Sequence, residues 1–149
     1  MGKKKEIIMI GFFIKSGDVD VDGMFSPYIW STVGIDPYVK KYIKPNVYSK
    51  HLDLLLIMFY VEGKYFDQPI ENGKVSNYNS KEKSISVAID VSKEKFHKRN
   101  EEERKKYIVE SIILAVNLVA DKMKKKKMEF NKEQLLKDLE DNVFKNYLN

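Results

Sequence analysis

Three aspartates at alternate positions, Asp18, Asp20 and Asp22, could together bind a metal ion. With Gly23 behind them they match the opening of an EF-hand calcium loop, in which alternate carboxylates are ligands and the glycine makes a sharp turn. That loop also needs a bidentate glutamate at its last ligand position, which here is Ile29. Both the number of ligands and the affinity for calcium fall without that glutamate. The sequence therefore predicts no metal site and no cofactor.

The same aspartates allow two other interpretations. In one, they face water along a strand while the valines between them pack inward. In the other, they form an acidic surface for a basic partner, because like charges at alternate positions repel one another and their exposure costs stability. The aromatic segment 24–48 follows at once, and its rings could either anchor a protein interface or cover the open face of a sheet. The candidate partner-binding residues are Asp18, Asp20, Asp22, Tyr28 and Trp30.

The chain carries no arrangement of residues that supports catalysis. Asp53, Glu62 and Lys64 follow the order of a metal-dependent nuclease, whose two carboxylates share one metal ion. On a single strand the two acids would stand about 30 Å apart and on opposite faces. The two histidines, His51 and His97, have no metal-ligand spacing, and the chain has no cysteine. We therefore expect a protein that is not an enzyme.

The net charge of +5 comes almost entirely from lysine. Lysines cluster at 3–5 and 122–127, whereas Arg99 and Arg104 are the only arginines. Specific recognition of phosphates and bases favours the arginine fork, which argues against nucleic acid as the ligand. A nucleic-acid-binding accessory or phage-type protein that uses the lysine clusters is kept as the alternative function.

The apolar run after the N-terminal lysines has the general form of a signal peptide. However, Glu6 interrupts it, and Lys15 stands where small residues should precede cleavage. A buried first strand explains the run better, and no other segment is long and uncharged enough to span a bilayer. We expect a cytoplasmic protein with no membrane partner, and the sequence leaves its oligomeric state open.

Three segments have the pattern of strands. Residues 6–15 and 51–65 are apolar at consecutive positions, which is typical of strands covered on both faces. Residues 84–91 alternate, which directs Ile85, Val87, Ile89 and Val91 to the core. Between them, Asn72-Gly73 favours a hairpin turn, and Asp36-Pro37 favours the start of a short helix through residue 43.

The last third of the chain has the period of helices. Asn100 and Glu103 predict a capping box, followed by a helix to about residue 126, and a second helix begins after Asn131. Apolar residues repeat every four positions along the second helix, at Leu135, Leu139, Val143 and Tyr147. Strands followed by helices predict a single α+β domain over residues 1–149. We expect an antiparallel sheet, two C-terminal helices packed on one face, and an irregular aromatic-rich insertion after the first strand.

Two blocks resemble a known class of protein. The blocks are ISVAIDVSKEKFHKRNEEERKKYIVESIILAVNLVADKM (85–123) and FNKEQLLKDLEDNVF (130–144). They are similar to the C-terminal part of small immunity proteins from bacterial polymorphic-toxin and contact-dependent inhibition systems. The resemblance implies an inhibitor that binds a cognate toxin and neutralises it by surface occlusion, with no catalytic residues of its own. Immunity proteins directed at nucleases are often acidic and this chain is basic, so the class of toxin is left open.

Overall fold

A computed structural model describes residues 8–14, 35, 37–43, 47–61, 73–91 and 100–149. The strands are β1 (Ile8–Ile14), β2 (Leu54–Val61), β3 (Lys74–Val75) and β4 (Ser84–Val91). The helices of the C-terminal third are α3 (Glu101–Lys125), α4 (Lys132–Asp138), the π-helix η1 (Leu139–Phe144) and α5 (Lys145–Leu148). Residues 35 and 37–42 are also helical, which agrees with the short helix predicted there. The predicted α+β class is confirmed.

The four strands form one mixed sheet in the order β1-β2-β4-β3. β1 pairs with β2 and β2 pairs with β4 in parallel, and only the two-residue β3 runs antiparallel to its neighbour. The prediction of an antiparallel sheet is therefore wrong for the three long strands. Residues 15–34, 36 and 44–46 of the predicted aromatic-rich insertion lie outside the described part of the chain, whereas residues 35, 37–43 and 47–50 are described.

The parallel pairing has a clear origin in the sequence. β2 reads LLLIMFYV and β1 reads IMIGFFI, and such unbroken apolar runs are typical of parallel strands. Parallel neighbours need a crossover of a dozen or so residues. The segments 15–53 and 62–83 are both long enough, whereas an antiparallel pair could have been joined by a short turn.

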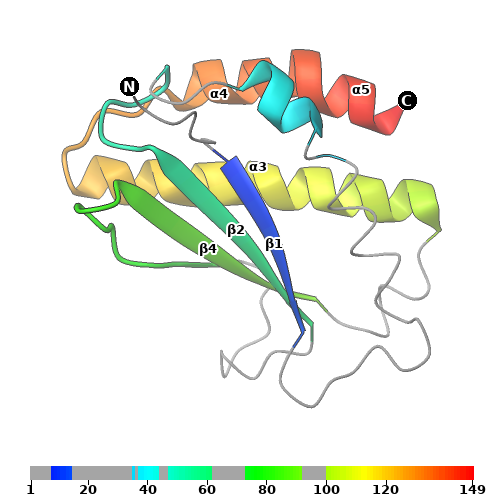
Figure 1. The fold of residues 1–149 in the computed structure, drawn as a ribbon, viewed down its shortest axis with the longest axis horizontal. Coiled ribbons are helices and arrows are strands. Elements are labelled where there is room, and N and C mark those ends of the chain that lie inside the picture. Colours follow the sequence, from blue (N-terminus) through cyan, green and yellow to red (C-terminus); the bar gives the residue numbers. More distant parts are fainter. Residues whose placement is uncertain (1–7, 15–34, 36, 44–46, 62–72, 92–99) are drawn as a thin grey trace.

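One face of this sheet carries the hydrophobic core. Leu55 and Ile57 of β2 are fully buried, as are the predicted core residues Ile85, Val87 and Ile89 of β4. The intervening residues Leu54, Leu56, Ser84 and Ser86 are only half-buried, whereas the small Ala88 is buried as well. Figure 1 shows α3 crossing the strands behind the sheet, where its stripe of buried residues closes the core.

Helix α3 begins and ends with local signals. The predicted capping box is present, with the Asn100 side chain accepting from the Glu103 backbone and the Glu103 side chain accepting from the Asn100 backbone. At the other end, the Met128 N–H donates to the Met123 carbonyl (2.9 Å) and the Lys127 N–H donates to that of Lys124 (3.0 Å). This is a Schellman motif, and its left-handed residue is Lys127 (φ 59°) where glycine is usual.

The second helical stretch returns beside α3 (Figure 1). Its four-residue apolar repeat is confirmed, because Leu135, Leu139, Val143 and Tyr147 are all buried. On an ideal α-helix this repeat would drift around the axis by about 40° per step. The wider η1 segment has more residues per turn and sets the repeat back toward one face.

Candidate partner-binding surfaces

The five residues predicted to bind a partner, at positions 18 to 30, lie outside the described residues. The structure shows where the segment that contains them starts, because β1 ends at Ile14. Ile14 pairs with Val61 of β2, and Val61 pairs with Val91 of β4, so the three parallel strands end in register. The segments starting at residues 15, 62 and 92 therefore leave the sheet from neighbouring positions, which we call the carboxyl edge.

The carboxyl ends of parallel strands are the usual place for functional loops. In this chain the segment after β1 contains the three aspartates, Tyr28 and Trp30. These residues are candidates by type alone, and the parallel topology adds that the segment containing them starts at this edge. Whether they contact a partner stays a prediction.

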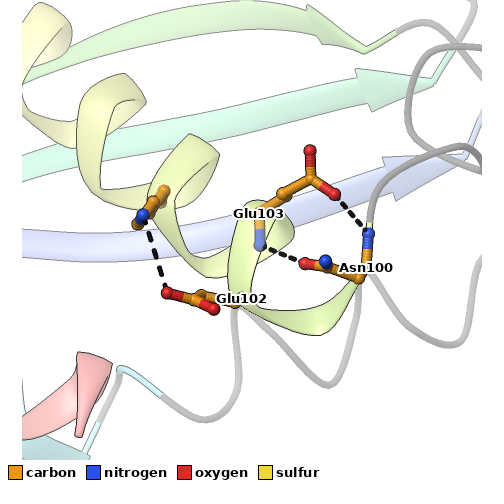
Figure 2. Close-up of polar contacts among 4 residues, drawn as sticks. Asn100, Glu102 and Glu103 are labelled. Atoms are coloured by element: carbon orange, nitrogen blue, oxygen red, sulfur yellow. Dashed lines mark hydrogen bonds and ion pairs between the residues drawn. The ribbon is translucent and has the colours of Figure 1, made fainter.

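The first turn of α3 holds a second group of acids, Glu101, Glu102 and Glu103, all exposed. Figure 2 shows the capping box, with Glu103 N–H donating to Asn100 Oδ1 (2.8 Å) and Asn100 N–H donating to Glu103 Oε1 (3.0 Å). Glu102 pairs with Lys106 one turn on, at 3.6 Å. Helix capping and the helix dipole account for these acids, so they define no site of their own.

Three tyrosines of the aromatic segment are described, and all three turn toward the core. Tyr38 and Tyr42 are half-buried and pack against it, and Tyr48 is 3% exposed. For these rings the structure favours the interpretation in which the aromatics cover the fold.

Tyr48 also joins the segment before β2 to the C-terminal helices. Its hydroxyl donates to Asp138 Oδ2 (2.6 Å), and its carbonyl accepts from the Asn131 N–H (2.8 Å). The neighbouring buried Ser49 donates to the Glu129 carbonyl (2.6 Å). Burial, followed by the hydrogen bond and charge of Asp138, raises the pKa of Tyr48 above its ordinary value. We call these contacts the Tyr48 clasp.

At the amino end of the strands, three separate segments that contain lysines lie at one end of the molecule (Figure 1). Hydrogen bonds hold the segments 50–53, 81–83 and 121–129 close together, and some of these bonds are made by Ser49 and Tyr78 beside them. The Asp53 N–H donates to the Lys83 carbonyl (2.8 Å), the Tyr78 hydroxyl donates to the His51 carbonyl, and Ser49 donates to Glu129. The three segments contribute eight lysines against four acids, and we call this surface the basic pole. Its lysines are Lys50, Lys81, Lys83, Lys122, Lys124, Lys125, Lys126 and Lys127.

Sequence reasoning identified only the 122–127 part of the basic pole. Nothing local in the sequence connects it to Lys50 or to Lys81, because the parallel crossovers bring these segments together. The sequence does indicate that strands start near Leu54 and Ser84. Because these two residues are partners in the sheet, Lys50 and Lys81, which precede them, come to the same end of the strands.

The metal and nuclease hypotheses gain no support from the described residues. Within those ranges no group of three or more histidines, cysteines or acids could hold a metal ion. Asp53 directly precedes β2, and the strand between it and position 62 is unbroken. None of the helices in the described ranges has the length and apolar character needed to cross a membrane.

The fold and its surfaces define a small α+β protein with a parallel core, a carboxyl edge and a basic pole. A model of the immunity protein 44 family matches residues 11–144, and the chain belongs to that family. The resemblance of the two C-terminal blocks to immunity proteins is therefore confirmed, and the match extends over most of the chain. No curated protein and no solved structure matches this sequence.

Proposed function

We propose that this immunity protein binds a cognate bacterial toxin of a polymorphic-toxin system in the cytosol and neutralises it by covering the toxin's active site. The observation that carries the proposal is the family match over residues 11–144. In this mechanism the protein acts by binding and not by catalysis. A preformed surface suits such a role, because a rigid interface loses little conformational entropy when the complex forms.

The toxin-binding surface in this proposal lies at the carboxyl edge. Asp18, Asp20, Asp22, Tyr28 and Trp30 follow β1 in the sequence, and β1 ends beside the ends of β2 and β4. Aspartates would attract a basic region of the toxin and speed its association. Tyrosine and tryptophan would supply most of the contact energy, since they bury a large area with few rotatable bonds.

The test uses the toxin encoded by the adjacent gene. Expression of this protein should restore the growth of cells that produce the toxin, and the purified pair should form a complex in titration calorimetry. We expect the variant Asp18→Ala/Asp20→Ala/Asp22→Ala to bind at least about tenfold more weakly, and Tyr28→Ala/Trp30→Ala to lose more.

The matched control is Glu133→Ala/Glu140→Ala/Asp141→Ala, which removes the same charge from exposed positions of α4 and η1. This control should bind like the unaltered protein. Full affinity in the aspartate and aromatic variants would remove those residues from the interface. Absence of both growth rescue and a complex would refute the proposed function itself.

A further inference from the structure

The basic pole has properties that neither the fold nor the proposed toxin interface explains. We infer that it is a docking surface for an acidic, carboxylate-rich protein surface, separate from the carboxyl edge. The two surfaces lie at opposite ends of the parallel strands, and β2 and β4, with eight residues each, would separate them by roughly 26 Å. The residues of the basic pole are distinct from those assigned to the toxin, so the inference goes beyond the proposed function.

Helix stabilisation accounts for only part of the charge. Lysines in the last turn of α3 offset the negative end of the helix dipole, which is reason enough for Lys122, Lys124 and Lys125. Lys50, Lys81 and Lys83 belong to turns before β2 and β4, and no helix ends at them. Their convergence with the end of α3 is a property of the assembled surface.

Backbone strain singles out the same surface. In the described part of the chain the non-glycine residues with positive φ are Lys83 (φ 50°) and Lys127 (φ 59°), and both belong to the basic pole. Glycine or asparagine normally occupies such left-handed positions, because other side chains destabilise them. A lysine at both positions lowers stability and adds charge, which is the pattern expected where function and not folding selects the residue.

The basic pole is also prepared for binding. Apart from the half-buried Lys122, its lysines are exposed. Among the residues that the structure describes, none of them forms an ion pair with an acidic side chain. The hydrogen bonds of Ser49, Tyr78 and Asp53 fix the backbones of the three segments relative to one another. Such a surface binds without first having to order its backbone.

The composition of the pole favours carboxylates over a nucleic-acid backbone. It contains no arginine, and the arginine fork is the group best suited to phosphates and bases. Its four acids, Asp53, Glu82, Asp121 and Glu129, are interspersed among the lysines. A continuous row of phosphates would be repelled by these acids, whereas a protein surface can place its own lysines opposite the three exposed ones, Glu82, Asp121 and Glu129.

The experiment measures fluorescence anisotropy with a labelled glutamate-rich peptide that carries a few interspersed lysines and, separately, with a labelled DNA duplex of equal net charge. The protein should bind the peptide at low salt, and the affinity should fall as salt is raised. Lys50→Glu/Lys81→Glu lies outside α3 and should weaken peptide binding by about tenfold. Lys137→Glu/Lys145→Glu, the control with the same net charge at exposed helix positions, should weaken it by less than about threefold.

A second variant uses the strained positions. Lys83→Gly/Lys127→Gly should unfold at a higher urea concentration than the unaltered protein and yet bind the peptide several-fold more weakly. That combination separates a binding role from a structural one. If the lysines were kept for folding, replacing them would not stabilise the protein.

Three results would overturn the inference. Equal losses in the two lysine-to-glutamate variants would show attraction by net charge alone. Tighter binding of the duplex than of the peptide at the same salt would make the pole a nucleic-acid surface. Undiminished peptide binding by the glycine variant would remove the strained lysines from any interface. The assay contains no toxin, so its outcome is independent of the proposed function.

Discussion

At the scale of single residues, the Tyr48 clasp makes a prediction about alkaline pH. Tyr48→Phe keeps the buried ring but leaves Asp138 with Gln134 as its remaining side-chain partner. We expect a loss of about 1 kcal/mol in the free energy of unfolding at neutral pH. Because the folded-state pKa of Tyr48 lies above its ordinary value of 10.0, its contribution is fully present below pH 10 and is lost as pH rises further.

The measurement is urea unfolding of both proteins at several pH values. The stability difference between them should be constant between about pH 7 and pH 9 and should shrink toward pH 11. Tyr38→Phe is the control, since Tyr38 is half-buried against the same core, and this change should leave stability nearly unaltered. A difference that stays the same up to pH 11 would mean that the hydroxyl of Tyr48 is not held as described.

At the scale of elements, the end of α3 predicts a stabilising substitution. Lys127 occupies the left-handed position of the Schellman motif, and an L-residue with a side chain is strained there. Lys127→Gly should therefore raise the free energy of unfolding by about 1 kcal/mol, measured by chemical denaturation. The change removes one charge from a crowded lysine run, which should act in the same direction.

The neighbouring residue is the control for that charge. Lys126 has an ordinary backbone conformation (φ −89°), so Lys126→Gly removes the same charge without relieving strain. It should leave stability unchanged or lower it by up to about 1 kcal/mol, because glycine has more freedom to lose on folding. If both substitutions stabilised the protein equally, charge and not backbone conformation would be the cause.

The elements also show where sequence reasoning succeeds. The start of α3 at Asn100, the second cap at Asn131 and the inward face of β4 were predicted correctly, because each depends on residues only a few positions apart. The direction of the strands was predicted wrongly. Pairing is decided by crossovers between distant segments, and the order of strands and helices alone does not distinguish a parallel from an antiparallel sheet.

At the scale of the whole molecule, the two candidate surfaces differ in how far the sequence alone can predict them. The acidic and aromatic residues at positions 18 to 30 could be chosen by type, but only the parallel sheet indicates that they follow an edge where three strands end together. The basic pole could not be predicted, because its members come from three segments that the sequence keeps apart. Charge patterning reveals a cluster when it lies on one element and misses one that the fold assembles.

The basic pole predicts how the stability of the whole protein responds to salt. The pole contains eight lysines and only four acids, so repulsion among the lysines opposes folding at low ionic strength. Sodium chloride screens that repulsion, and raising its concentration to about 0.5 M should increase the melting temperature by a few degrees.

Lys50→Glu/Lys81→Glu should be more stable than the unaltered protein at low salt and should respond less to added salt. Lys137→Glu/Lys145→Glu, which lies near Glu133, Glu140 and Asp141 in the sequence, should not be stabilised. Equal salt responses in all three proteins would show that the lysines of the pole are too far apart to repel one another.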